Sequence, residues 1–208
     1  MNRYYFKIIA AIILLISSVQ ISQAAGLYSK PEFRGRVIDA ETKEPLEGAV
    51  VVFLYDRWPI IGGPGGPNSY IFHAKETLTD SKGEFNIPSF SSFILSSLDA
   101  GIRFIFYKPG YMASYGRDNI SPTLIESYFS AGKIGEEKEI EGGTFEQGSY
   151  VKWKGPLGIV ELKRATTREE KLRTMPSPPT DFTSKELPIL IKIINEEGKN
   201  LGLKGEYK

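Results

Sequence analysis

The sequence predicts a mainly β protein with short helices near the C-terminus. From Phe33 onward, short apolar runs follow one another at close spacing and are bounded by Gly, Pro, Asp and Asn, a pattern typical of strands joined by turns. Two T-x-x-E segments, 167–170 and 183–186, each precede a stretch with helical character. The 208 residues, 41% of them hydrophobic, suffice for one domain with a buried core.

Residues 1–24 have the layout of a secretory signal peptide. Arg3 and Lys7 precede an unbroken apolar run at 8–16, and small residues stand at Ser22 and Ala24, before a cut at Ala25. The alternative is a retained anchor, but the apolar run is shorter than a membrane span requires. We therefore expect an exported chain, periplasmic or extracellular, with no membrane span after cleavage. Lipid attachment is excluded because it needs a cysteine.

Composition excludes most catalytic and metal chemistry. The chain has no Cys and one His, which excludes thiol nucleophiles, thiolate metal sites, disulfides and schemes that need two imidazoles. Residues 1–24 contain two basic residues and no acid, so their removal leaves 24 basic against 25 acidic residues. This balance attracts neither nucleic acid nor anionic lipid. We expect a protein that is not an enzyme and has no cofactor.

Strands and turns can be assigned in order through the first half of the chain. Strands are predicted at 33–38, 49–55 and 70–79, and the last places Tyr70, Phe72, Ala74 and Leu78 on one face. The stretch from Trp58 to Pro67 contains three prolines and four glycines, so it predicts a loop beyond the sheet.

A tight turn at Asp80–Gly83 leads into a strand at 84–87, because Asp accepts from backbone amides and Gly tolerates positive φ. Residues 89–98 have apolar side chains at helical spacing and predict a short helix. Residues 113–149 give no clear pattern. A final hairpin is predicted from 150–154 and 158–163, with its turn at Gly155-Pro156.

Two strands predict a covered outer face. The strands at 49–55 and 101–107 are apolar on both sides, whereas a strand with one solvated face alternates. The segment 184–197 has a wide apolar stripe with Leu187, Leu190, Ile191 and Ile194. We therefore expect this segment to dock on the sheet. The expected organisation is a β domain at 25–165 and a helical C-terminal extension at 166–208.

Four motifs occur in one order over residues 33–112. They are Gly-Arg-Val-Ile-Asp at 35–39, Pro-Leu-Glu-Gly-Ala-Val-Val at 45–51, Thr-Asp-Ser-Lys-Gly-Glu-Phe at 79–85 and Lys-Pro-Gly-Tyr at 108–111. Together they resemble the carboxypeptidase regulatory-like domain family. The resemblance implies an antiparallel Greek-key β-sandwich of the transthyretin-like, prealbumin type, with about seven strands. It also implies a non-catalytic module, so no active-site residue is carried over.

Three sets of residues have a functional interpretation beside a structural one. His73 is predicted at the surface, on the polar face with Lys75, rather than as a metal ligand. Asp39, Glu41, Glu44 and Asp80 fit turn polarity better than a calcium site, because their spacing matches no calcium loop. The exposed-aromatic candidates for ligand binding are Trp58, Tyr70, Tyr111, Tyr115 and Trp153.

The sequence thus favours an exported, non-catalytic β-sandwich module with a binding or structural role in the cell envelope. Its expected partner is an unidentified protein or glycan, and its oligomeric state is left open. The alternative is a carbohydrate- or peptidoglycan-binding module that uses exposed aromatic residues near the Gly/Pro loop.

Overall fold

The computed structural model describes residues 25–59, 69–95, 97–116, 150–154, 157–180 and 182–208. The predicted signal peptide, most of the Gly/Pro loop, the turn at Gly155-Pro156 and most of the segment 113–149 lie outside these residues. The mainly β prediction is confirmed, with several antiparallel sheets and two short C-terminal helices. In the described part, no helix is both long enough and apolar enough to cross a membrane.

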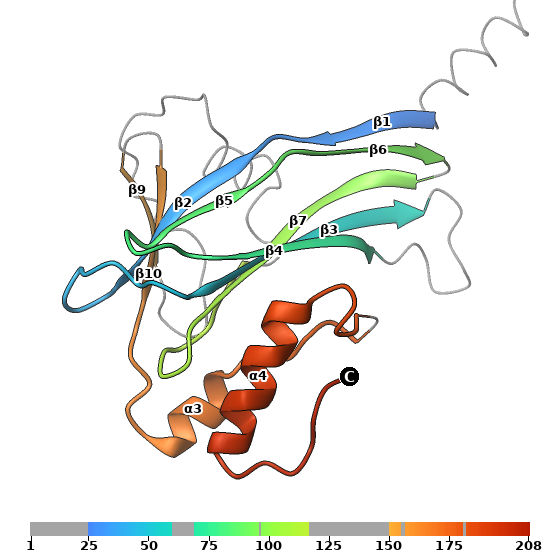
Figure 1. Ribbon diagram of the computed structural model, residues 1–208. Helices are drawn as coiled ribbons and strands as arrows, with labels where there is room; N and C mark the ends of the chain where they lie inside the picture. Colours follow the sequence, from blue (N-terminus) through green and yellow to red (C-terminus); the bar gives the residue numbers. More distant parts are fainter. Residues whose placement is uncertain (1–24, 60–68, 96, 117–149, 155–156, 181) are drawn as a thin grey trace, which may run out of the picture.

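Within the described residues, ten strands form three sheets (Figure 1). One four-stranded sheet has the order β5 (Glu84–Ile87), β2 (Phe33–Asp39), β10 (Leu157–Leu162), β9 (Tyr150–Lys154). The other has the order β4 (Tyr70–Leu78), β3 (Val50–Pro59), β7 (Ser97–Tyr107), β8 (Ser114–Gly116). A two-stranded sheet pairs β1 (Ala25–Lys30) with β6 (Phe90–Leu95). The predicted final hairpin is confirmed as β9–β10.

One pairing departs from the expected antiparallel pattern. β10 runs parallel to β2, with Val160 opposite Val37. β2 ends at Asp39 and β10 begins at Leu157, so the two strands are far apart in the sequence. A long connection permits a parallel neighbour that a hairpin cannot supply. The strand register therefore depends on tertiary packing and not on the local turn.

Two prolines interrupt one long strand ladder and divide it between two sheets. β2 pairs with β5 and β1 pairs with β6, so the pairing resumes at Lys30 opposite Phe90 after ending at Phe33 opposite Ile87. Pro31 and Pro88 stand in the interruption on either side. Because proline has no N–H for a ladder, both strands break at the same level. The β1–β6 pair consequently extends over the end of β3, β4 and β7 (Figure 1).

The two four-stranded sheets share an apolar core. Its members include Phe33 and Val37 of β2, Phe53 of β3, Phe106 of β7 and Val160 of β10, all 2% exposed or less. The rings of Phe33 and Phe53 stack with their centroids 4.8 Å apart. Burial of these side chains is the main stabilising contribution to the β fold.

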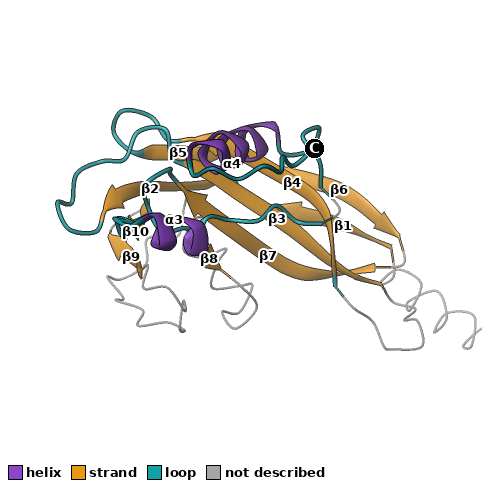
Figure 2. Ribbon diagram, turned by 90° about the horizontal axis from the view of Figure 1, so that it is seen from below, coloured by secondary structure: helices purple, strands orange, loops and turns teal. Residues whose placement is uncertain are grey.

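A second core lies on the other face of β3 and β7. Val50, Val52 and Leu54 of β3 are buried together with Ile105 and Tyr107 of β7. The helix α4 (Pro188–Asn200) covers them with Leu190, Ile191 and Ile194, and Leu187 just before the helix belongs to the same core. Figure 2 shows α4 lying across the strands of this sheet. The prediction that the C-terminal segment docks on the outer face of the two apolar strands is confirmed.

The two capping boxes have different outcomes. At α3 (Arg168–Thr174), the Thr167 hydroxyl accepts from the Glu170 N–H, and the Glu170 carboxylate accepts from the Thr167 N–H, as predicted. At 183–186 the Thr183 hydroxyl and N–H also bond Glu186, but they close only a turn. The helix begins at Pro188, because a proline disfavours helical backbone in the residue before it.

Two further predictions were wrong. Residues 89–98 form β6 and the start of β7 instead of a helix. In β4, the predicted common face of Tyr70, Phe72, Ala74 and Leu78 does not exist. Tyr55 pairs with His73 and Asp56 pairs with Ile71, so Phe72 is an extra residue in a β-bulge. Phe72 packs in the inner core, whereas Ala74 packs against the core under α4.

Candidate functional site

Exposed apolar side chains gather at the end of the molecule where β3 stops and β4 and β7 begin. Trp58 is 50% exposed, Tyr70 44%, Leu98 50% and Phe93 of the neighbouring β6 65%. We call these four residues the apolar end. Figure 1 shows β3 and β6 ending, and β1 beginning, on this side of the molecule. A contiguous set of apolar side chains in water marks a contact surface, and strand pairing decides which of these four are neighbours.

Strand pairing fixes the centre of the apolar end. Trp58 lies directly opposite Leu98 in the β3–β7 ladder, so the two side chains lie on the same face of the sheet, about 5 Å apart at Cβ. Along β3, Trp58 continues the face of Leu54 and Asp56, the face that α4 covers further along the strand. Trp58 and Leu98 therefore form an exposed continuation of the face buried under α4.

Trp58 and Tyr70 do not form one stacking platform. Tyr70 lies opposite Arg57, the residue before Trp58. Because successive residues of a strand point to opposite faces, Tyr70 shares the face of Arg57 and not that of Trp58. Arg57 itself lies with its guanidinium carbon 3.5 Å from the centroid of the Phe72 ring. The described part therefore has no flat row of aromatic residues beside the Gly/Pro loop on which a sugar chain could stack.

An aromatic cluster supports the apolar end from within. Tyr28 of β1 lies edge-on to Phe72, with ring centroids 5.0 Å apart. His73 stacks on Phe90 at 4.1 Å and on Tyr55 at 5.5 Å. These contacts join β1 and β6 to β3 and β4, so they hold the apolar end in a fixed shape.

The predicted surface position of His73 was wrong, although it does share a face with Lys75. The ring is partly buried, and its Nε2 finds no hydrogen-bond partner among the described residues. Burial lowers the pKa of His73, and the nearby Lys75 ammonium lowers it further. The reason for the error is β6, which covers this face of β4: Lys75 Nζ donates to the carbonyls of Pro88 and Ser89, both at 2.9 Å.

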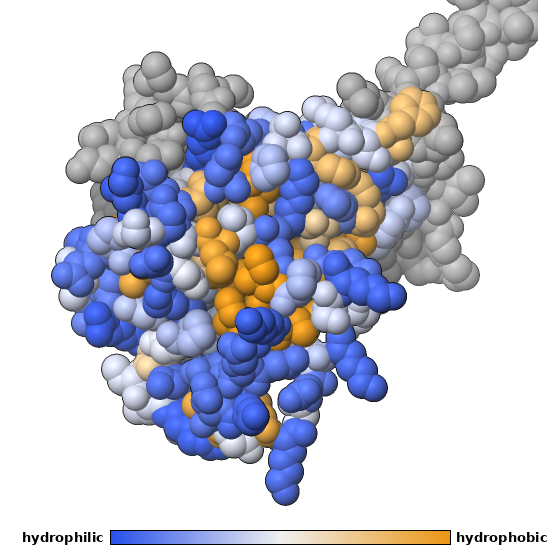
Figure 3. Space-filling model, viewed as in Figure 1, coloured by the Kyte–Doolittle hydropathy of each residue, from blue (hydrophilic) through white to orange (hydrophobic). Residues whose placement is uncertain are grey.

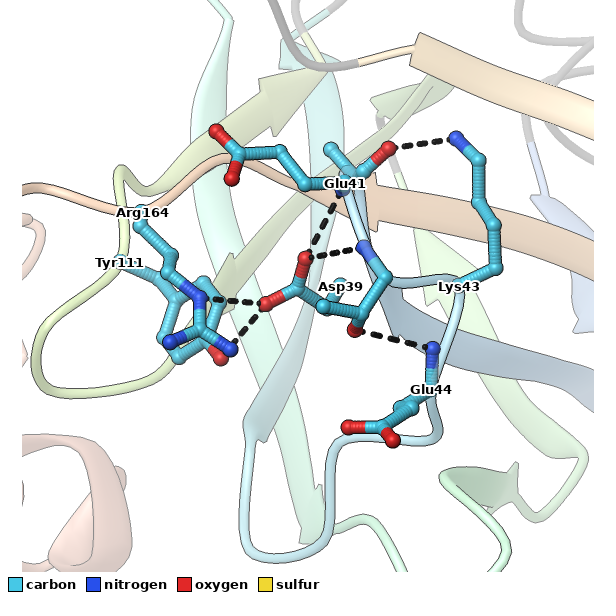
Figure 4. Close-up of polar contacts among 8 residues, drawn as sticks. Asp39, Glu41, Lys43, Glu44, Tyr111 and Arg164 are labelled. Atoms are coloured by element: carbon cyan, nitrogen blue, oxygen red, sulfur yellow. Dashed lines mark hydrogen bonds and ion pairs between the residues drawn. The ribbon is translucent and has the colours of Figure 1, made fainter.

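Tyr111, another predicted binding residue, belongs to an internal network (Figure 4). Its hydroxyl donates to Asp39 at 3.0 Å, and the Arg164 guanidinium donates to the same carboxylate oxygen at 2.7 Å. Asp39 also accepts from the N–H groups of Glu41 and Thr42, at 2.8 and 3.0 Å. Tyr111 thus holds the end of β2 to the segment after β10 and offers no stacking platform.

The same network gives the acidic residues a structural role. Asp39 is 1% exposed. Burial opposes its ionisation, but hydrogen bonds from the Thr42 N–H, Arg164, the Glu41 N–H and Tyr111 outweigh burial and lower its pKa. Asp80 accepts from the N–H groups of Lys82 and Glu84 in the predicted turn. The turn interpretation of Asp39 and Asp80 is confirmed, since their oxygens are bonded to donors of the protein.

Tyr115 and Trp153 have described backbone only. Tyr115 lies in β8 opposite Ile105, and Trp153 lies in β9 opposite Gly158; their side chains lie outside the described part. Ile105 pairs with Val52, six residues from Trp58, which is about 20 Å along a strand. β9 belongs to the other four-stranded sheet. The fold therefore does not bring the five predicted aromatic residues together.

Sequence reasoning missed Phe93 and Leu98. Both fall in the stretch that helical spacing assigned to a helix, where they would not lie beside Trp58. A signal against the helix was present: residues 89–98 contain five serines and follow Pro88, and serine is a weak helix former. If the stretch had been predicted as a strand, Leu98 would have been expected to pair with a residue of a neighbouring strand.

Two further acidic side chains of the described part, Glu76 and Asp56, accept hydrogen bonds within the fold. Glu76 has a raised pKa because it is partly buried, although the N–H groups of Ile189 and Leu190 donate to it. Asp56 is buried and accepts two hydrogen bonds of 2.6 Å from Arg103. No group of three or more metal-ligating side chains occurs among the residues that the structure describes.

Comparisons with known proteins assign no function to the apolar end, so its interpretation rests on its geometry. Searches of family models, of curated proteins and of solved structures found no match to this chain.

Proposed function

We propose that this chain is an exported, non-catalytic module that binds a component of the cell envelope through its apolar end. The observation that carries the proposal is the Trp58–Leu98 pair, two large side chains that are each 50% exposed and lie opposite one another on adjacent strands. Complete burial of such a side chain is worth about 1.5–3 kcal/mol, so burial of the exposed half of each at a contact would gain roughly half of that. Export is inferred from the layout of residues 1–24.

The proposal includes a fold assignment. We infer a transthyretin-like Greek-key sandwich, related to carboxypeptidase regulatory-like domains, in which the two four-stranded sheets are the layers and α4 is an added third layer. Support comes from the order of the four motifs in residues 33–112 and from the apolar core that both sheets share. In that family type the sandwich binds or supports other parts and carries no catalytic residues.

A non-catalytic role is supported by the polar residues with shifted pKa values. The carboxyls of Asp39 and Glu76 are the candidates for acid–base chemistry. Each is bonded to backbone N–H groups, and Asp39 is also bonded to Tyr111 and Arg164. Burial raises the pKa of Glu76, and the hydrogen bonds to Asp39 outweigh burial and lower its pKa, so contacts within the fold account for both shifts.

A glycan-binding module is the second candidate, favoured by the exposure of Trp58 and Tyr70. Their positions on opposite sheet faces weaken it, because a sugar chain stacks along aromatic rings of one face. In a glycan-binding module of this kind, the sugar stacks on Trp58 alone, with Leu98 beside it.

Fractionation of envelopes tests the proposal. The chain carrying Trp58→Ala and Leu98→Ala is compared with the unaltered chain and with a Leu78→Ala control, in which a similarly exposed residue is removed from the opposite end of β4. We expect at least a tenfold loss of retention on one fraction, whether washed membranes, sacculi or envelope proteins, for the double variant alone. Equal retention of all three chains on every fraction would overturn the proposal.

A further inference from the structure

The chain leaves the fold beside the apolar end. β1 begins at Ala25, which lies opposite Leu95 of β6. Three residues separate Leu95 from Leu98, so the two are at most about 10 Å apart. Leu98 in turn lies opposite Trp58. Residues 1–24 therefore connect to the fold at the end that carries the exposed Trp58 and Leu98.

The connecting segment has a chemistry of its own. Residues 8–16 are an unbroken apolar run that follows two basic residues, the composition that enters lipid at the start of export. Eight residues, 17–24, join this run to β1 and reach at most about 28 Å when extended. Before the cut at Ala25, while residues 8–16 lie in a bilayer, residues 17–24 keep the end of the fold where β1 begins within about 28 Å of the lipid.

The side chains of the apolar end suit a lipid–water interface. Trp and Tyr are enriched at this depth because each has an apolar body and a polar tip, and Phe and Leu transfer readily into hydrocarbon. Without residues 1–24 the chain has one more acidic than basic residue. The contact is thus driven by burial of apolar surface and not by attraction to anionic headgroups.

We propose that the apolar end docks on the surface of a lipid bilayer, with Trp58 and Leu98 at the centre of the contact and Tyr70 and Phe93 at its margin. The inference rests on the proposed function and names its partner. A protein or a glycan at the same surface is the alternative that the experiment separates from it.

Depth-dependent quenching tests the proposal on the full chain. The chain contains two tryptophans, so Trp153→Phe leaves Trp58 as the single tryptophan. This chain is incorporated into phosphatidylcholine vesicles whose acyl chains carry bromine, and its emission is compared with that in unbrominated vesicles. We expect a blue-shifted emission that falls at least twofold with bromine, in 50 mM and in 500 mM salt alike.

Two controls separate docking from tethering by residues 1–24. Leu78→Trp, in a chain with Trp58→Phe and Trp153→Phe, reports from the opposite end of β4, where we expect no quenching. Leu98→Asp in the Trp58-only chain is expected to abolish the quenching, whereas Leu78→Asp is expected to leave it intact. Urea unfolding of each chain confirms that the variants fold.

The outcomes are distinct. Absent quenching of Trp58, equal quenching of both probes, or quenching that survives Leu98→Asp would each overturn bilayer docking. If envelope retention depends on Trp58 and Leu98 while vesicles give no quenching, the proposed binding function stands and the partner is a protein or a glycan. If neither experiment depends on these residues, both proposals fall.

Discussion

Glu76 and Leu190, 114 residues apart in the sequence, are joined by a hydrogen bond of 2.9 Å from the Leu190 N–H to the Glu76 carboxylate. The other carboxylate oxygen accepts from the Ile189 N–H at 2.5 Å. The residue preceding α4, Leu187, provides no side-chain cap. A strand residue thus supplies the cap that the helix lacks, and it fixes where α4 lies on the sheet. Figure 3 shows hydrophobic surface at the centre of the face on which β4 and α4 meet.

Removal of this cap should weaken the docking of α4. We expect Glu76→Ala to lower the free energy of unfolding by about 1 to 2 kcal/mol, the usual effect of losing an N-terminal cap. Glu76→Gln should lower it less, because one amide oxygen still accepts and burial already disfavours the charged form. Urea unfolding at pH 7 measures both. The exposed Glu196→Gln is the control, and a Glu76→Ala chain as stable as that control would contradict the assigned role.

Asp39 should be the most sensitive position of the network in Figure 4. Asp39→Asn keeps the shape but replaces the oxygen that accepts from Tyr111 and Arg164 by an NH2 group, and we expect a loss of roughly 1–3 kcal/mol at pH 7. Since the folded state lowers the pKa of Asp39, its contribution is complete above about pH 5 and is lost progressively as the pH falls through the ordinary value near 3.9 toward the lowered pKa. The difference in unfolding free energy between the two chains should therefore shrink between pH 7 and pH 3. A constant difference over this range would be evidence against the network.

His73 should make stability depend on pH in a different window. The folded state lowers its pKa, so its contribution is complete above the ordinary value near 6.5 and is lost as the pH falls below it. We expect the unaltered chain to lose more stability between pH 7.5 and pH 5.5 than a His73→Phe chain, which keeps the ring beside Phe90. Parallel urea titrations at the two pH values measure this. The same pH response in both chains would show that His73 is not responsible.

Two glycines with positive φ should respond unequally to alanine. Gly83 has a φ of 72°, and a Cβ there would lie 2.4 Å from the Val37 carbonyl oxygen. Gly48 has a φ of 71° with no atom within 4 Å of the added Cβ. Gly48→Ala should cost only the backbone term of about 1–2 kcal/mol, and Gly83→Ala should cost clearly more. Thermal unfolding compares them, and equal losses would mean that the Val37 carbonyl moves away without cost.

The sequence by itself determined the features that depend on neighbours along the chain. Turn chemistry placed the bend at Asp80–Gly83, the T-x-x-E box placed the start of α3 at Thr167, and two strands without alternation predicted a covered face. Helical periodicity identified the stripe of α4 that covers it. These predictions succeeded because hydrogen bonds and side-chain period within a few residues decide such features.

Only the tertiary structure decided what depends on contacts between distant segments. The parallel pairing of β10 with β2, the bulge at Phe72 and the cap from Glu76 to α4 have no local signal. The bulge shifts the parity of β4, which is why Tyr70 and Trp58 lie on opposite faces. A separate register shift in the β3–β7 ladder, between Asp56 and Arg57, precedes the pairing of Trp58 with Leu98. Register and strand order minimise exposed apolar surface over the whole chain, so the composition of the candidate site followed from the fold and not from the positions of its aromatic residues.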